Sequence, residues 1–180
     1  MPRPLALLIL GAVTTALAYA PASAPAPPGY RVLYSGNPPG GGAWDLSAKR
    51  RKLSGYSGLC LSFTTRTPEG VEFSGVGCAG GSLRAWGNVF PMSSGYGGNL
   101  NTNLVGGFAA DRARKAVISF ADGRRVTVGT RIGPRGWRRA LGEPVRFFVV
   151  NAFPRTKAAA RSVSVLDARG RQIGRSKIGQ

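Results

Sequence analysis

Short runs in which apolar and polar residues alternate recur along this chain, separated by residues typical of turns. Leu59, Leu61 and Phe63 alternate with polar neighbours, and Val126 and Val128 do the same. A period of two is typical of a strand with one face in a core and the other in solvent. Many such runs, without helical periodicity, predict an all-β protein. We expect an antiparallel β-sandwich of immunoglobulin-like or fibronectin-like form, with a small β-barrel as the alternative.

Two turns between predicted strands are marked by glycine. Asp122-Gly123 separates two β-branched runs, and Gly170 separates the run at 163–165 from the one that begins at Gln172. Glycine adopts a positive φ without steric cost, so each pattern predicts a hairpin. The run at 145–150, which is apolar except for Arg146, predicts a central strand.

The N-terminus has the layout of an export signal. Arg3 precedes an apolar run at residues 5–20, and small residues follow. This order predicts a signal peptide over residues 1–22, cleaved after Ala22, with Ala20 and Ala24 as alternative cleavage positions. An uncleaved membrane anchor is the other interpretation, although the run is short for a bilayer span. We therefore expect a protein that is secreted or associated with the cell envelope.

The remaining chain divides by composition. Residues 23–42 are rich in Pro, Gly, Ala and Ser, which predicts a tether, with an edge strand at 30–34 as the alternative. Residues 43–180 are expected to form a single β-rich domain. Within it, residues 79–107 contain paired glycines and no clear periodicity, which predicts a long Gly-rich loop.

Cys60 and Cys78 are the two cysteines of the chain. An exported chain meets an oxidising environment, and an even cysteine count is consistent with one disulfide between them. Two buried free thiols are the alternative.

Several chemistries are excluded by composition. The chain has no histidine, so Ser-His-Asp catalysis and His-ligated metals are impossible, and two cysteines cannot complete a four-ligand zinc site. Seven carboxylates remain, and Asp45 alone among them lacks an obvious local role. We expect no catalytic residues, cofactor or metal site. The alternative is an enzyme of unrecognised type, which could use only carboxylates, Ser, Tyr or Lys. A hydrolytic activity that is lost on changing Asp45 or Glu72 would indicate such an enzyme.

The net charge is +18, and residues 111–180 carry 17 of the 25 basic residues. Arginine forms bidentate hydrogen bonds with anions, and an exposed tryptophan can stack on rings. The candidate polyanion-binding residues are Arg124, Arg125, Arg135, Trp137, Arg138 and Arg139. A GC-rich genome also favours Arg over Lys, so the basic excess can be purely compositional.

Our leading interpretation is a non-enzymatic exported protein that acts by surface contact at the cell envelope. The alternative is a cationic module that binds teichoic acid, an acidic glycan, phospholipid or nucleic acid. Sequence-specific nucleic-acid binding is not expected, and no small-molecule substrate is evident.

Several segments of the predicted domain also occur together in other exported proteins. They are Leu59-Cys60-Leu61, Gly77-Cys78, the runs at 105–107, 116–128 and 146–150, and the run at 163–171. In these segments the chain resembles a type of uncharacterised exported β-rich proteins of actinobacteria. The resemblance covers roughly residues 43–175 and implies a secreted β domain. That type has no assigned activity, so it implies no site residue.

Overall fold

A computed structural model describes residues 28–53, 55–97, 101–133, 139–140 and 143–179. The predicted signal peptide and the first residues of the predicted tether lie outside these ranges. The described elements are β1 (Arg31–Gly36), β2 (Ala43–Leu53), β3 (Tyr56–Arg66), β4 (Glu72–Gly80), the short 3-10 helix η1 (Leu83–Trp86), β5 (Val89–Gly97), β6 (Thr102–Ala110), β7 (Lys115–Phe120), β8 (Arg125–Gly129), β9 (Arg131–Ile132), β10 (Arg139–Ala140), β11 (Glu143–Asn151), β12 (Ala160–Leu166) and β13 (Gln172–Lys177).

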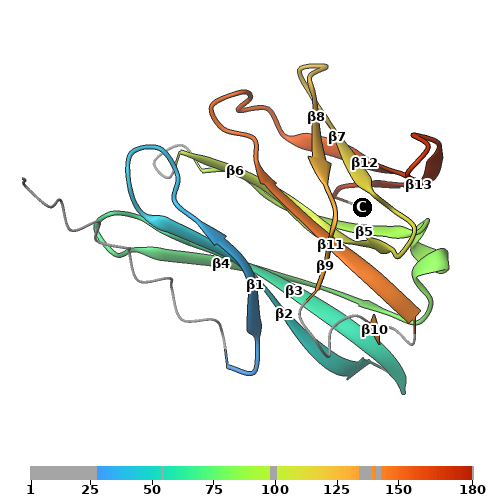
Figure 1. Cartoon of the computed structure of the whole chain (residues 1–180). Helices are drawn as coiled ribbons and strands as arrows, with labels where there is room; N and C mark the ends of the chain where they lie inside the picture. The colour runs from blue at the N-terminus through green and yellow to red at the C-terminus, as the bar shows by residue number, and fades with distance from the viewer. Residues whose placement is uncertain (1–27, 54, 98–100, 134–138, 141–142, 180) are drawn as a thin grey trace, which may run out of the picture.

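The described strands form three antiparallel sheets. The first has the order β1-β2-β3-β4, the second β10-β11-β6-β5 with β9 also paired to β11, and the third β13-β12-β7-β8. The second sheet lies between the other two (Figure 1). The all-β, antiparallel class is therefore confirmed. None of the described sheets closes into a barrel, and three layers replace the two expected of a sandwich, so this topology does not confirm an immunoglobulin-like or fibronectin-like fold.

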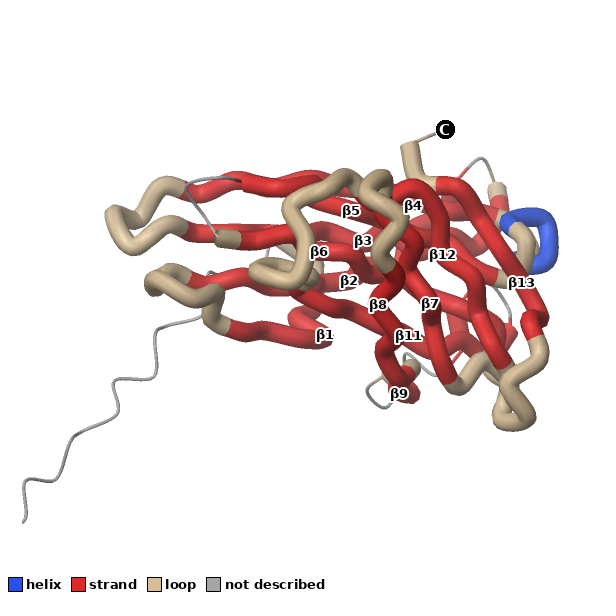
Figure 2. The backbone as a smooth tube through the Cα atoms, turned by 90° about the horizontal axis from the view of Figure 1, so that it is seen from above, coloured by secondary structure: helices blue, strands red, loops and turns tan. Residues whose placement is uncertain are grey.

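Strand β6 lies at the centre of the molecule and is buried on both faces. Leu104 and Phe108 pack into the core between the first and second sheets. Val105 and Ala109, on the opposite face, pack into the core between the second and third sheets. The strands of the third sheet run obliquely across those of the second (Figure 2). Because β6 contacts a core on each face, its sequence shows no alternation of polar and apolar residues.

Residues 79–107 differ from the long Gly-rich loop that the sequence predicts. This segment contains η1, β5 and most of β6. The glycines serve close packing: a Cβ at Gly107 would lie 2.2 Å from the carbonyl oxygen of Phe90. Glycines that allow two strands to approach interrupt the apolar pattern, which explains why the strands were missed.

The N-terminal part of the described chain also corrects the sequence expectation. Arg31–Gly36 form β1, an edge strand paired with β2, where a tether was expected. The edge strand that the sequence left as an alternative at 30–34 is therefore what the structure shows. Aromatic and aliphatic residues of β1, Leu33 and Tyr34, pack against the first core, and this burial orders a segment of low-complexity composition.

Both glycine hairpins are confirmed. Gly123 has φ +82° between β7 and β8, and Gly170 has φ +78° between β12 and β13. Asp122 Oδ1 accepts a hydrogen bond from the backbone of Arg124, and Asp167 Oδ1 accepts from that of Arg169. The strand predicted at 145–150 is part of β11, inside the second sheet.

Cys60 and Cys78 form the predicted disulfide. They face each other across β3 and β4, with their Cα atoms 4.0 Å apart. Among the described helices, none is long and apolar enough to cross a membrane.

Candidate ligand-binding cleft

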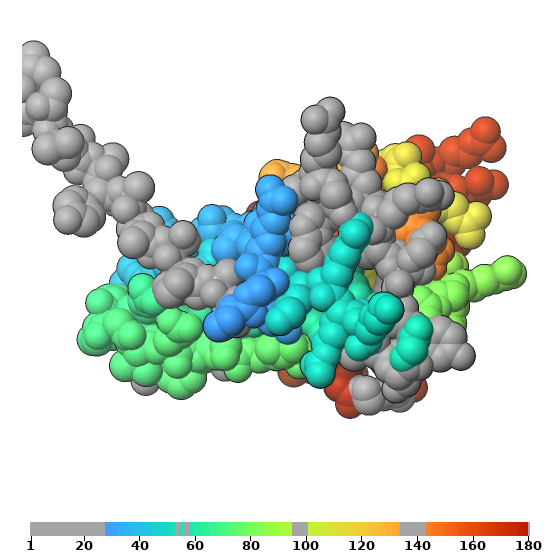
Figure 3. All heavy atoms as spheres, turned by 90° about the horizontal axis from the view of Figure 1, so that it is seen from below, coloured from blue at the N-terminus to red at the C-terminus, as the bar shows by residue number. Residues whose placement is uncertain are grey.

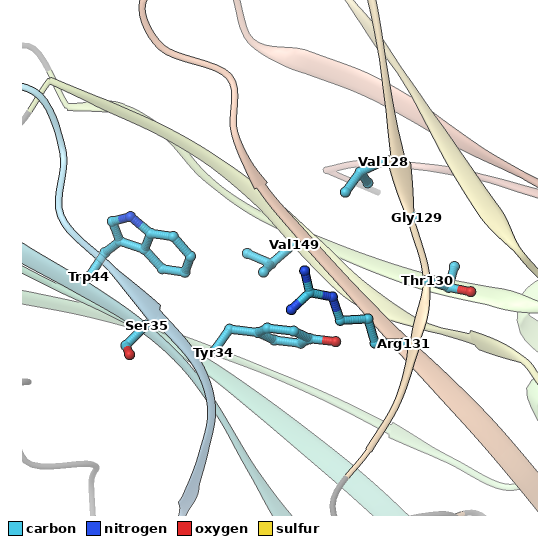
Figure 4. A pocket seen from close by; sticks show the side chains of 8 residues that line it. All are labelled: Tyr34, Ser35, Trp44, Val128, Gly129, Thr130, Arg131 and Val149. Atoms are coloured by element: carbon cyan, nitrogen blue, oxygen red, sulfur yellow. The ribbon is translucent and has the colours of Figure 1, made fainter.

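A cleft of about 360 Å³ opens where the edge of the first sheet approaches β8, β9 and β11. Its volume lies at the lower end of the range for small-ligand sites. The residues that line it come from β1, β2, the β8–β9 segment and β11. They are Tyr34, Ser35, Trp44, Val128, Gly129, Thr130, Arg131 and Val149 (Figure 4).

Arg131 supplies the charge of this cleft. Its side chain extends from the backbone toward Tyr34, and the guanidinium carbon lies 5.8 Å from the centre of the Tyr34 ring (Figure 4). A guanidinium over an aromatic face is held by cation–π attraction while its N–H groups stay free to donate. All seven carboxylate residues of the chain are described, and none of them forms a salt bridge with Arg131.

A hydrogen bond to the second sheet holds the Tyr34 side chain in place. Its hydroxyl donates to the carbonyl oxygen of Phe147 over 3.4 Å, and its ring packs against the first core. Burial raises the pKa of the Tyr34 phenol, while the nearby cations Arg131 and Arg146 lower it. The phenol therefore remains neutral at physiological pH and acts as a platform for the guanidinium.

Trp44 and Ser35 form the opposite side of the cleft. Trp44 lies across from Arg131, and Val149 lies between them (Figure 4). Gly36 is the cross-strand partner of Trp44, and a Cβ at Gly36 would lie 2.7 Å from the indole ring. The glycine thus leaves room for the indole to lie flat along the sheet edge.

A hydrogen-bond network holds the backbone next to Arg131. Arg146 donates from Nε to Thr130 Oγ1 over 2.8 Å and from a terminal nitrogen to the Thr130 carbonyl over 3.0 Å. Thr130 in turn donates to the carbonyl of Ala113 over 2.7 Å. Burial, and then the neighbouring cation Arg114, lower the pKa of Arg146, although the guanidinium stays charged. Thr130 and Arg146 therefore position β9.

Of the predicted polyanion-binding residues, Arg124 and Arg125 are the ones whose side chains the structure describes, and neither lines this cleft. Arg124 lies in the β7–β8 turn, 3.7 Å from Asp122, and Arg125 is exposed at the start of β8. Arg139 begins β10, and its side chain is not described. Arg135, Trp137 and Arg138 lie outside the described residues.

Several carboxylate side chains form an ion pair or a hydrogen bond with a described residue. Glu72, Asp122 and Asp167 pair with Arg66, Arg124 and Arg171. Glu143 accepts a 2.6 Å hydrogen bond from the backbone N–H of Leu83. Asp45, the acid without a predicted role, is buried on the face of β2 opposite Leu46 and is not among the residues that line the cleft.

Asp45 and Glu72, the acids of the enzyme alternative, both lie on the first sheet. Burial raises the pKa of Asp45 to about 6, and Arg66 opposes this shift. Within the described ranges, no three Cys, Asp or Glu side chains are grouped so that they could hold a metal ion.

Sequence reasoning missed the cleft residues Tyr34, Trp44 and Arg131. Tyr34 falls in the predicted tether at 23–42, and Trp44 lies at the start of the predicted domain with no motif around it. Arg131 carries no local signal, because it is one of 20 arginines and occupies the polar position of an alternating run. The three are separated by up to 97 positions in the sequence, from Tyr34 to Arg131, and only the stacking of the sheets joins them.

Comparison of the chain with family models, curated proteins and solved structures found no match. The resemblance to exported actinobacterial proteins therefore stays a prediction.

Proposed function

We propose that this protein is an exported, non-enzymatic binding domain that acts by contact at the cell envelope, and that the cleft holds an acidic unit of an envelope glycan. The proposal rests mainly on Arg131, whose guanidinium has no carboxylate partner among the described residues and lies over Tyr34 at a cleft that also contains Trp44. The disulfide supports the exported location, because such bonds persist in oxidising compartments.

The chemistry of the three side chains favours an acidic sugar over a bare anion. A guanidinium donates two parallel hydrogen bonds to a carboxylate or phosphate. An indole presents an apolar face that suits the C–H face of a sugar ring. Val128 and Val149 add apolar surface, and Ser35 and Thr130 add polar groups, so the cleft combines one charge with a lining of both kinds.

The test is binding of the purified protein to isolated cell envelopes over a salt series. The variants are Arg131→Gln and, as a control of equal charge, Arg169→Gln in the exposed β12–β13 turn. Loss of a charged hydrogen bond weakens binding about tenfold or more, so Arg131→Gln should bind at least tenfold more weakly than Arg169→Gln. Equal losses in the two variants would show that bulk charge acts alone and would refute the cleft as the site.

The ligand class is tested with two soluble polysaccharides. Polygalacturonate, which carries a carboxylate on each sugar, should bind to the wild type and compete with the envelopes. A neutral glucan of similar length should do neither. Competition by both polymers, or by neither, would contradict an acidic sugar as the ligand.

A further inference from the structure

Strand β4 forms one edge of the first sheet and has β3 as its described neighbour. Its first five residues, 72–76, are exposed. In the view from below, the green part of the chain that includes β4 lies at the margin of the molecule (Figure 3). This edge is therefore accessible along more than half of its length.

The pairing with β3 shows which backbone groups of β4 are unused by that strand. The Thr67 N–H donates to the Val71 carbonyl over 2.9 Å in the β3–β4 turn. Hydrogen-bonded and non-hydrogen-bonded pairs alternate from there along an antiparallel ladder. The 4.0 Å Cα separation of Cys60 and Cys78 agrees with a non-hydrogen-bonded pair in that alternation. Glu72, Ser74 and Val76 therefore direct their N–H and C=O groups away from β3.

This edge carries few of the features that usually prevent strand pairing. Natural edge strands carry charged residues, proline or a bulge. The sequence of β4, EFSGVGCAG, has one charged residue, Glu72 at its start, which pairs with Arg66. It contains no lysine, arginine or proline, and its register with β3 is unbroken. Phe73 and Val76 are instead 54% and 57% exposed on this strand.

The distribution of charge makes β4 a part of the surface where two copies of this chain repel each other least. Residues 53–110 contain two basic residues, Arg66 and Arg84, and two acids, Glu69 and Glu72, so their net charge is zero. The remaining chain carries the whole excess of +18. Two copies of so basic a protein repel each other over most of their surface, but not at β4.

We propose that two copies of this protein associate through β4, paired antiparallel about a two-fold axis that passes through Gly75. In a dimer with two-fold symmetry the same surface of each copy faces that of the other, so this surface must be complementary to itself. In this register Val76 of each copy lies opposite Ser74 of the other, and Phe73 lies opposite Gly77. The first sheets of the two copies then form one continuous sheet.

The side chains suit this register. Phe73, Gly75 and Gly77 lie on the same face of β4, because alternate residues share a face. A Cβ at Gly75 would meet no atom within 4 Å, so there is open space beside this glycine, whereas a Cβ at Gly77 would lie 2.8 Å from Met92 Sδ. An aromatic ring from the facing strand can cover a glycine in a sheet, and diagonal neighbours are within reach of an aromatic side chain. The exposed Phe73 of one copy therefore lies beside Met92 of the other and diagonally across from the open space at Gly75.

The first experiment is sedimentation equilibrium of the exported protein over a concentration series, at moderate ionic strength. The wild type should dimerise, and Val76→Lys should weaken the dimer at least tenfold by placing a charge in the pairing edge. Ile132→Lys is the matched control, since Ile132 is 53% exposed on β9 and gains the same charge. Equal thermal unfolding midpoints would show that both variants fold.

The second experiment tests the register. Gly75→Cys places two thiols at a non-hydrogen-bonded pair across the axis, and peptide mapping should find an interchain disulfide between them with Cys60–Cys78 intact. A wild type that is monomeric at all concentrations overturns the proposal. A dimer that Val76→Lys leaves intact, or in which the Gly75→Cys variant forms no interchain disulfide, also overturns it.

Discussion

Asp45 and Thr64 face each other across β2 and β3, each 1% exposed, yet their side-chain oxygens have no hydrogen-bond partner in the described part of the chain. Ser47 and Ser62, the next facing pair on this side of the sheet, are also buried without a side-chain partner there. Unsatisfied polar groups cost stability when buried, and a charged group costs most. Asp45 is therefore the residue whose protonation is expected to change the stability of the first sheet.

We predict that Asp45→Asn removes a pH-dependent loss of stability. Burial raises the Asp45 pKa from its ordinary 3.8 to about 6, so the folded state holds this proton more tightly than the unfolded state. Stability of the wild type should fall as pH rises from about 4 to about 6 and stay lower above it. The difference in the free energy of unfolding between variant and wild type should shift in favour of the variant by on the order of 1–3 kcal/mol between pH 4 and pH 8. Urea unfolding across this range measures it, and parallel pH profiles would contradict it.

Loss of the disulfide should destabilise the protein without changing its fold. The bond closes a loop with a sequence separation of 18. In the chain-entropy treatment a loop of this size contributes about 3 kcal/mol by restricting the unfolded chain. The double variant Cys60→Ala, Cys78→Ala should lose about that amount in urea unfolding, with an unchanged β-sheet circular dichroism spectrum. Equal unfolding midpoints of the variant and the wild type would refute this.

Gly107→Ala should be among the most damaging alanine substitutions in the sheets. A Cβ there would lie 2.2 Å from the Phe90 carbonyl oxygen and 2.9 Å from the Phe148 ring. Overpacking of this kind costs about 3 kcal/mol or more, because backbone as well as side chains must shift. Gly129→Ala is the control, since its Cβ would meet nothing within 4 Å and should change stability by less than about 1 kcal/mol. Similar thermal unfolding midpoints for the two variants would contradict the close packing.

Asn103→Ala should loosen the connection between β11 and β12. The Asn103 amide donates to the carbonyls of Thr156 and Ala158 over 3.1 and 3.0 Å, and Asn103 is fully buried. Removing the Asn103 amide leaves the carbonyls of Thr156 and Ala158 without this donor, which should lower the free energy of unfolding by about 2 kcal/mol. Urea unfolding measures the loss, and amide hydrogen exchange should rise first between residues 152 and 159. A change below about 0.5 kcal/mol would show that water replaces the amide.

Local features of the fold could be predicted from the sequence. The hairpins at Gly123 and Gly170 follow from turn chemistry that involves a few neighbouring residues. The strand at Leu59–Phe63 follows from alternation, because its other face is polar. The pairing of Cys60 with Cys78 could be predicted because the chain offers a single pair of cysteines.

The three-layer arrangement could not be predicted in the same way. Strand β6 is buried on both faces, so the alternation that identifies a strand in a two-layer sandwich is absent from it. Its glycines suggest a loop when considered locally, whereas Gly106 and Gly107 permit neighbouring elements to approach. Likewise, Leu33 and Tyr34 order a segment whose composition alone indicates a tether.

For the cleft, too, the sequence indicates the local elements, and the tertiary structure decides which side chains meet. Alternation and turn residues identify strands because backbone geometry couples only neighbouring positions, and composition shows that arginine is abundant and histidine absent. Which of the 20 arginines stands over an aromatic ring is decided by contact between Arg131 and Tyr34, which lie on different sheets of the folded chain. That contact forms only when two sheets bury their apolar faces against each other, and so it is a property of the tertiary structure.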